Sequence, residues 1–354
     1  MKEEMQFRPM DTESLTRLLA DIRQKIGLER GVQPKVTGLK TQQDGSLKIV
    51  VPDRAEKGMC LGPGGRVIAQ LAQELQKHVT VVAVEEQITR RHRMQATLAR
   101  IEELQEELAS SQVAFLNRLR AAIESRLEEE PIENIAPSPS PHPAVALSGG
   151  IDSCAAMVLL KEMGFHPIGL TVELEEEHET YRAARNVAQI CKKLGCKQMI
   201  VAGPSELREV VRKTQAGRIH PCGNCHELIL SRVIDISKEH GFETLVTGEL
   251  LPTGRQSIIL MGELLLVHLP AALSLTKYET QSLCKENGFE LESTQFGCSL
   301  VRQAHTKGWR GIQPSVYRVL RETQANVLTS GQAIQYIRSI LKTVFATHED
   351  PMEK

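Results

Sequence analysis

A glycine turn between two apolar segments carries the first residues that could do chemistry. The segment SGGIDS follows the apolar run 144–147 and precedes a second apolar run with helical character. Gly149 and Gly150 permit backbone angles that a Cβ would forbid, so successive N–H groups can face one concavity at the start of the next helix. Ser148 and Ser153 add two hydroxyl groups. The pattern predicts a strand, a phosphate-binding turn and a helix.

Asp152 indicates that the phosphate site also binds a metal ion. A carboxylate is unfavourable beside an anion unless it binds Mg²⁺ that neutralises the phosphates. The Walker A pattern with its lysine and the G-x-G-x-x-G pattern are both absent. The turn instead resembles the SGGxDS signature of the PP-loop family of ATP pyrophosphatases. This resemblance implies that ATP is cleaved between its α- and β-phosphates, that a substrate oxygen is adenylated, and that ATP is bound through Ser148, Gly149, Gly150, Asp152 and Ser153.

Three of the eight cysteines have a spacing that suits a metal centre. Cys222 and Cys225 form a C-x-x-C pair before an apolar helical run, and Cys298 follows much later. Three thiolates leave one position open on a bound metal or cluster, which suits chemistry more than structure. The residues alone leave several alternatives open: a redox pair, cluster ligands, or a zinc site completed by His220 or His226.

The order of these cysteines resembles the iron–sulfur branch of PP-loop tRNA thiolation enzymes. The resemblance implies that Cys222, Cys225 and Cys298 hold a 4Fe–4S cluster, with Zn²⁺ as the alternative metal. Sulfide at the iron without a protein ligand would then attack the adenylated base, which makes these cysteines catalytic together with Asp152.

A second element supports the same branch. The segment Thr247-Gly248-Glu249 ends an apolar strand, where ligands of α/β proteins sit. It resembles an element of the 4-thiouridine synthase branch, and Lys277 in the next helix matches that branch as well. The resemblance implies that Thr247 and Gly248 contact ATP.

A second glycine loop lies near the N-terminus. The sequence GPGG begins at Gly62 and precedes a helix, with strand-like segments before and after. A tight glycine loop lets a nucleic-acid backbone approach closely. The pattern resembles a KH domain and predicts RNA binding, although a basic residue usually stands in the loop where this chain has proline. The predicted RNA contacts are Gly62, Gly64, Gly65 and Arg66.

Composition and charge limit the class of protein and the kind of nucleic-acid contact that this chain can have. Hydrophobic residues make up 41% and charged residues 25% of the 354 residues, which is ordinary for a globular protein. The net charge is −1, so contact with nucleic acid must come from local patches. No apolar stretch has the length of a membrane span. The N-terminus lacks the apolar part of a signal peptide, so we expect a cytoplasmic protein with reduced cysteines.

The chain reads as an α/β protein with several parts. Apolar segments at 144–147, 167–174, 197–202 and 243–248 alternate with helical segments, which predicts a parallel sheet. Alternating Pro and Ser favour an extended linker. A helical stripe suggests a long helix or a helical hairpin that could pair in a homodimer. The predicted parts are a KH-like α+β domain (1–86), the helical segment (87–130), the linker (131–143), the PP-loop domain (144–300) and a helical region (301–354).

The leading hypothesis is an ATP-dependent tRNA sulfurtransferase that uses ATP, Mg²⁺ and a 4Fe–4S cluster. It would adenylate the carbonyl of a uridine or cytidine in tRNA and replace the oxygen with sulfur from sulfide or another donor. One alternative is a PP-loop ligase or sulfur transferase for a small molecule, with zinc at the C-x-x-C site. Another is a non-catalytic protein that binds RNA and ATP.

Overall fold

The computed structural model describes residues 10–28, 33–42, 45–129, 142–173, 179–290 and 296–345. The chain divides into two compact units, Met1–Arg91 and His92–Lys354. Most of the predicted linker 131–143 lies outside the described residues. No helix in the described ranges is both long and apolar enough to cross a membrane.

The first unit has three strands and three α-helices. β1 and β2 are antiparallel, and β3 lies parallel to β2. Side chains of β2 and β3 alternate between buried and half-buried, so one face of the sheet forms a core with the helices. The elements in chain order are α1 (Thr12–Lys25), β1 (Gly38–Thr41), β2 (Leu47–Val51), α2 (Arg54–Leu61), the 3₁₀ turn η1 (Pro63–Gly65), α3 (Arg66–Leu75) and β3 (Val79–Ala83).

The second unit is built on a six-stranded sheet. Its strand order is β6-β5-β4-β7-β9-β8, and only the edge strand β8 is antiparallel to its neighbour. This arrangement confirms the predicted α/β fold with a parallel sheet. The strands are β4 (Ala144–Ala146), β5 (Ile168–Glu173), β6 (Lys197–Ala202), β7 (Thr244–Thr247), β8 (Ile258–Met261) and β9 (Leu264–His268).

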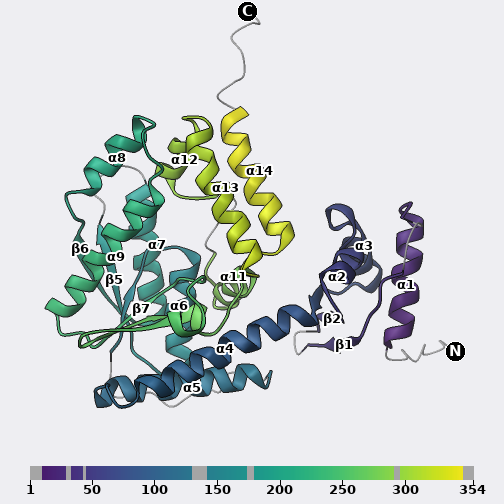
Figure 1. The fold of residues 1–354 in the computed structure, drawn as a ribbon, viewed down its shortest axis with the longest axis horizontal. Coiled ribbons are helices and arrows are strands. Elements are labelled where there is room, and N and C mark those ends of the chain that lie inside the picture. Colours follow the sequence, from purple (N-terminus) through teal and green to yellow (C-terminus); the bar gives the residue numbers. More distant parts are fainter. Residues whose placement is uncertain are drawn as a thin grey trace, which may run out of the picture. The chain divides into compact units, whose positions relative to one another are not determined.

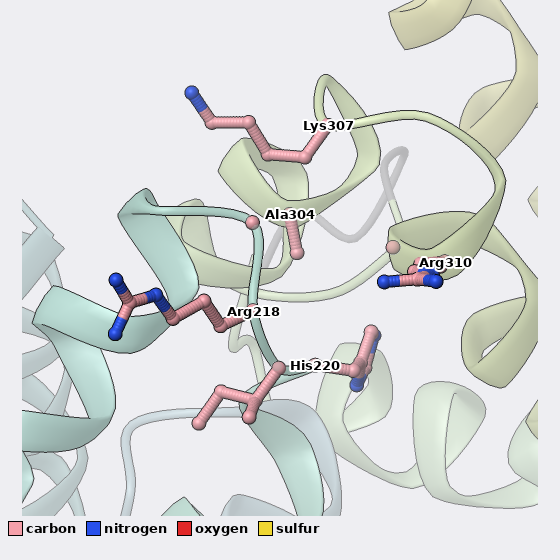
Figure 2. A pocket seen from close by; sticks show the side chains of 8 residues that line it. Arg218, His220, Ala304, Lys307 and Arg310 are labelled. Atoms are coloured by element: carbon pink, nitrogen blue, oxygen red, sulfur yellow. The ribbon is translucent and has the colours of Figure 1, made fainter.

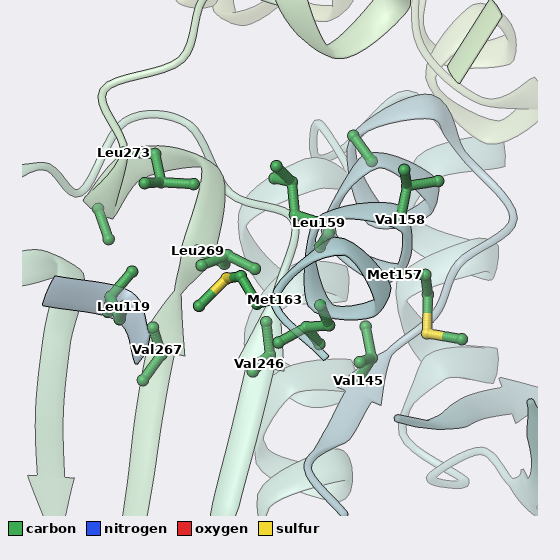
Figure 3. Packing of buried hydrophobic residues seen from close by; sticks show 14 of the residues in the cluster. Leu119, Val145, Met157, Val158, Leu159, Met163, Val246, Val267, Leu269 and Leu273 are labelled. Atoms are coloured by element: carbon green, nitrogen blue, oxygen red, sulfur yellow. The ribbon is translucent and has the colours of Figure 1, made fainter. Parts of the chain in front are cut away.

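Helices cover both faces of this sheet because its central strands are apolar on both sides. Val145 and Val246 face one core, which α6 (Ile151–Glu162) fills from its buried side chains. Figure 3 shows Met157 of this helix and Met163, which caps its C-terminal end, near the two valines. The neighbouring residues Ala144 and Leu245 face the opposite core, against α9 (Cys222–Glu239).

The remaining helices extend these layers. The segment predicted as one long helix or a hairpin consists of two helices, α4 (Val84–Leu104) and α5 (Ser110–Leu127), whose apolar residues join the first core. Figure 1 shows α5 alongside the second half of α4. The C-terminal part forms a cluster of three helices with its own small core. The other elements are α7 (Glu179–Leu194), α8 (Leu207–Gln215), η2 (Gly254–Ser257), α10 (Leu269–Ala272), α11 (Lys277–Glu286), α12 (Ser299–His305), α13 (Trp309–Gln324) and α14 (Ser330–Phe345).

Candidate functional site

The SGGIDS turn connects the end of β4 to the start of α6. Gly149 has φ +74°, a left-handed angle that favours glycine, and Gly150 caps the helix in an extended conformation. The hydroxyl of Ser153 donates to the Gly150 carbonyl (3.0 Å) and accepts from the Ser148 amide (3.3 Å). These bonds close the turn on itself. The first amides of α6 have no carbonyl partner within the helix, so this end is suited to an anion.

Asp152 points to α11 and has a partner for each oxygen. Its Oδ2 accepts from Lys277 Nζ at 2.6 Å, and its Oδ1 accepts from Thr280 Oγ1 at 2.9 Å. The side chains of Lys277 and Asp152 are 17% and 30% exposed, so the pair is shielded but reachable. Thr276 and Glu279 form a capping box that fixes the start of α11. A cation therefore stands beside the phosphate turn, although the turn itself contains no lysine.

Gly248 lies directly against the phosphate turn. A Cβ on this residue would come within 2.5 Å of the Ser153 amide nitrogen and 2.7 Å of the Asp152 carbonyl oxygen. Both neighbours are backbone atoms, so the contact requires glycine here. The ends of β4 and β7 thus meet at the edge where the strand order divides, the usual ligand position of an open α/β sheet.

Glu249 links this edge to the helix that carries the C-x-x-C pair. Its carboxylate accepts from His226 Nε2 at 2.9 Å. Burial raises the pKa of Glu249, but the hydrogen bond from His226 and nearby positive charge outweigh it, and the pKa lies below its ordinary value. The same bond raises the pKa of His226. On the other side, the Thr247 hydroxyl bonds to Nδ1 of buried His268 at 2.6 Å.

The three predicted cysteines come from two helix starts. Cys222 and Cys225 lie in the first turn of α9, both half-buried, and exposed Cys298 precedes α12. Burial raises the pKa of Cys222, and it raises that of Cys225 to about 11. The charge of Cys298 raises the pKa of both thiols further, so the three sulfurs are neighbours. Without a metal, Cys222 and Cys225 are protonated at neutral pH.

Arg318 of α13 is the cation beside this thiol site. Its positive charge lowers the pKa of the Cys222 thiol, against the larger effect of burial. Arg318 Nε also donates to Glu322 at 2.7 Å, and the guanidinium lies 5.9 Å from the centre of the Phe296 ring. A positive charge held in this way would stabilise bound thiolates.

The donor atoms at the thiol site suit a soft metal or an iron–sulfur cluster, because all three are sulfur. In the described ranges, no group of three or more His, Cys, Asp or Glu side chains is already arranged around a common metal position. Asp152 is likewise a single carboxylate, which fits Mg²⁺ only when phosphates and water supply the other ligands. Both sites have suitable residues, and both would be completed by what binds there.

The glycine loop of the first unit lies between α2 and α3. Gly62, Gly64 and Gly65 all have left-handed angles, with φ of +69°, +62° and +75°. A Cβ on Gly62 would meet Val67 Cγ2 at 2.2 Å, whereas one on Gly64 would meet nothing within 4 Å. The loop therefore packs on its own helix at one end and is open at the other, next to exposed Arg66.

Several residues at the site escaped sequence reasoning. Thr280, Asn186 and Arg318 carry no motif, since each acts through a contact with a distant segment. Asn186 Nδ2 donates to the Gly149 carbonyl at 3.2 Å. Thr280 donates to Asp152, and the positive charge of Arg318 acts on Cys222. Lys277, in contrast, could be picked out from the sequence, because it lies in the helix that follows the Thr-Gly-Glu element.

Residues 142–295 match the tRNA methyl transferase HUP domain. The chain is 30% identical over 224 residues to an uncharacterized protein of Methanocaldococcus jannaschii, a match that covers 63% of this chain and 84% of that protein.

More distant relatives have named activities. A tRNA-specific 2-thiouridylase of Clostridium botulinum is 25% identical over 178 residues, which is 46% of this chain and 48% of that protein. A second one, from Syntrophus aciditrophicus, is 30% identical over 118 residues, 29% of this chain and 32% of that protein. The chain thus spans less than half the length of these thiouridylases. Among solved structures, the U34-tRNA thiolase of Methanococcus maripaludis with its 4Fe–4S cluster matches with a TM-score of 0.40 at 15% identity, over 66% of this chain and 80% of that one.

Proposed function

We propose that this chain, which belongs to the family of the Methanocaldococcus jannaschii protein and carries a PP-loop HUP domain in residues 142–295, is an ATP-dependent tRNA sulfurtransferase. It would adenylate a carbonyl oxygen of a uridine or cytidine and replace that oxygen with sulfur. One set of contacts carries the proposal. His226, next to Cys225, bonds to Glu249, and the adjoining Gly248 packs on the phosphate turn. Thiols and phosphate turn therefore share one edge of the sheet.

The first half of the reaction, adenylation of the base, would take place at the phosphate turn. The pyrophosphate part of ATP would lie on the amides of Gly149 and Gly150 and the hydroxyls of Ser148 and Ser153, at the positive end of α6. Thr247 and Gly248 border the same space from β7. The base oxygen attacks the α-phosphorus, pyrophosphate leaves, and the base carries an AMP ester. The ester turns a poor leaving oxygen into a good one.

The Asp152–Lys277 pair would separate when ATP arrives. The ammonium of Lys277 is bound to Asp152 in the turn, and a phosphate dianion would compete with this carboxylate for it. The freed carboxylate would be one ligand of Mg²⁺, with phosphate oxygens and water as the others. Thr280 keeps the carboxylate oriented during this exchange through its bond to Oδ1.

The second half would use the three cysteines. Cys222, Cys225 and Cys298 would hold a 4Fe–4S cluster, which would present the sulfide that displaces AMP from the activated base. Arg318 beside Cys222 offsets the negative charge of the thiolates. His226 and Glu249 hold the C-x-x-C turn at the strand edge, within reach of an activated base. Zinc at the same thiols is the alternative and would leave sulfur delivery to another donor.

The first unit would hold the RNA. Its open glycine loop lets a sugar–phosphate backbone approach Gly64 and Gly65 without a side chain in the way, and Arg66 adds a positive charge. This KH-like role is sequence-tolerant because it uses backbone contacts. The catalytic unit would then receive a single exposed base.

Reconstitution tests the proposal directly. Anaerobically purified protein is mixed with ATP, sulfide and tRNA from a strain that lacks this gene. We expect AMP, pyrophosphate and a new thionucleoside to form in equal amounts, detected by mass spectrometry of digested tRNA. The variant Cys298→Ser should retain tRNA-dependent pyrophosphate release and lose the thionucleoside, while Cys60→Ser in the first unit serves as the matched thiol control. Identical thionucleoside profiles in the deletion strain and the wild type would refute tRNA thiolation.

A further inference from the structure

A small pocket lies between the segment that leads into α9 and the corner between α12 and α13. Its volume is about 50 Å³, the size of a small group rather than a nucleotide. Figure 2 shows the two segments facing each other, with His220 and Arg310 directed toward the space and Arg218 and Lys307 extending from its edges. The lining consists of Gly217, Arg218, Ile219, His220, Ala304, Lys307, Arg310 and Gly311.

Glycines and hydrogen bonds hold the pocket in shape. A Cβ on Gly311 would meet the Ala304 carbonyl oxygen at 1.8 Å, so only glycine lets α13 turn so tightly against α12. The two segments are joined by Ser315, whose hydroxyl lies 2.9 Å from His220 Nε2 and 2.8 Å from His305 Nε2. A pocket fixed in this way is a built feature of the fold and not a gap between mobile side chains.

Positive charge is concentrated around this pocket. Arg218, Lys307 and Arg310 are all exposed, and none of them forms an ion pair with a carboxylate of the described ranges. The chain as a whole has a net charge of −1. Residues 296–345, in contrast, contain only one acidic residue, Glu322, against seven basic ones: Arg302, Lys307, Arg310, Arg318, Arg321, Arg338 and Lys342. Such local asymmetry marks a surface for a polyanion.

The only tryptophan of the chain stands beside the pocket. Trp309 is 64% exposed, although a large aromatic side chain is normally buried, and it directly precedes Arg310. An exposed aromatic ring next to cations provides a face on which a nucleobase can stack. The pocket also lies near the thiol site in the sequence: His220, which lines it, is two residues before Cys222.

We propose that this pocket binds a backbone phosphate of the RNA substrate, with a neighbouring base stacked on Trp309. The inference rests on the proposed function for the identity of the RNA and adds the surface that brings it to the thiol site. Arg218, Lys307 and Arg310 neutralise the phosphate, and the pocket admits one phosphate group without its sugar. The strand would then continue toward Cys222 along the segment that lines the pocket.

Tryptophan fluorescence tests the proposal because Trp309 is the only source of the signal. Unmodified tRNA transcript is titrated into the full-length protein, and binding is measured in parallel by filter retention at several salt concentrations. We expect tRNA to quench the fluorescence and to shield Trp309 from acrylamide. The triple variant R218E/K307E/R310E should bind tRNA at least tenfold more weakly, and its slope of log affinity against log salt should be smaller by about 2 to 3.

A matched control separates the pocket from general charge effects. The variant K192E/K197E/K238E reverses three exposed lysines elsewhere on the same unit and should bind like the wild type apart from a small uniform loss. Equal losses in the two triple variants, or tRNA binding without any change in Trp309 fluorescence, would overturn the inference even if thiolation is intact. Quenching by inorganic phosphate that matches quenching by tRNA would also overturn it, since the site would then serve a free anion. A wild-type protein that binds no tRNA would defeat both proposals.

Discussion

The phosphate turn and the thiol site lie on the same edge of one sheet, yet they differ in how complete they are. At the turn, Ser148 and Ser153 bond to each other, Asp152 has partners for both oxygens, and Gly248 is in contact with backbone. At the thiol site, the sulfurs are neighbours but are not arranged around a common metal position in the described structure. The turn is organised by the fold, whereas the thiol site depends on what it binds.

This difference follows from the elements involved. The turn lies between a strand end and a helix start that share a core, so packing on both faces fixes it. Cys298 instead precedes a short helix in the small C-terminal cluster, and Cys222 only borders that cluster. A site that needs a metal to bring its ligands together gains its final order from metal binding. Four predictions test the contrast.

Metal uptake should depend steeply on pH. The pKa of Cys225 is raised to about 11 and that of Cys222 is also raised, so each thiol must lose a proton to bind a metal. With Zn²⁺ as a probe, we expect the apparent affinity of the apoprotein to rise between pH 6 and 8 by about tenfold per pH unit for each of these two thiols, or about a hundredfold per pH unit for both. Competition with a chromophoric chelator measures this. Cys225→Ser should remove one factor of ten per pH unit and Cys60→Ser none; a flat profile would show that the thiols do not act together.

Removal of the charge at the turn should reduce adenylation without loss of the fold. In Asp152→Asn the carboxylate that faces Lys277 is lost, while the hydrogen bond from Thr280 can remain. We expect tRNA-dependent pyrophosphate release to fall by about a hundredfold or more, because charged groups placed at a reacting phosphate stabilise the transition state. Asp235→Asn, an exposed carboxylate on α9, is the control. A wild-type rate in Asp152→Asn would contradict the role of this edge in ATP cleavage.

A methyl group should be tolerated at the thiol turn and not at the phosphate turn. In Gly248→Ala the new Cβ meets the backbone of Asp152 and Ser153, and we expect a loss of about 2 to 3 kcal/mol in the free energy of unfolding together with weaker ATP binding. In Gly223→Ala, between the two cysteines of α9, the Cβ meets nothing within 4 Å. This change should stabilise the protein by up to about 1 kcal/mol, since Gly is unfavourable in a helix. Denaturant titration compares the two; equal effects would refute the contrast in packing.

Acid should weaken the C-terminal cluster through His305. Burial lowers the pKa of this histidine to about 4, so the folded protein keeps it neutral while the unfolded chain protonates it near its ordinary value. Stability from this group is therefore complete above about pH 6.5 and is lost as the pH falls toward 4. Between pH 7.5 and 5 we expect a loss of about 1 to 2 kcal/mol that is absent in His305→Gln. The exposed His240→Gln is the control, and an unchanged pH dependence in His305→Gln would place the acid sensitivity elsewhere.

Burial of His305 carries an energetic cost, because one of its ring nitrogens has no hydrogen-bond partner in the described structure. His220 Nδ1 accepts from the Cys222 amide at 3.4 Å, so its Nε2 carries the proton and donates to Ser315. Ser315 then donates to His305 Nε2, which leaves the protonated Nδ1 of His305 buried without a partner in the described structure. Buried polar groups without partners are uncommon, and this one borders the residues of the pocket.

Local pattern was enough for much of the fold. The strand at 197–202 was predicted because the pattern of apolar residues and turn residues acts over a few positions. The β8–β9 hairpin was missed because Ile258–Met261 and Leu264–His268 are apolar runs without the alternation that marks a half-buried strand. Their burial in the sheet depends on helices from other parts of the chain.

Residue types and short spacings were sufficient to predict the glycine turn at 148–153, the strand–turn–helix around it, and the three thiols as candidates for soft-metal ligands. These features need no tertiary contacts to be recognised. Tertiary contacts, in contrast, place Lys277 against Asp152, bond Glu249 to His226 on the C-x-x-C helix, and bring Arg218 and Arg310 to one pocket. Such pairs lie far apart in the chain, and only packing of strands and helices around a common core brings them together.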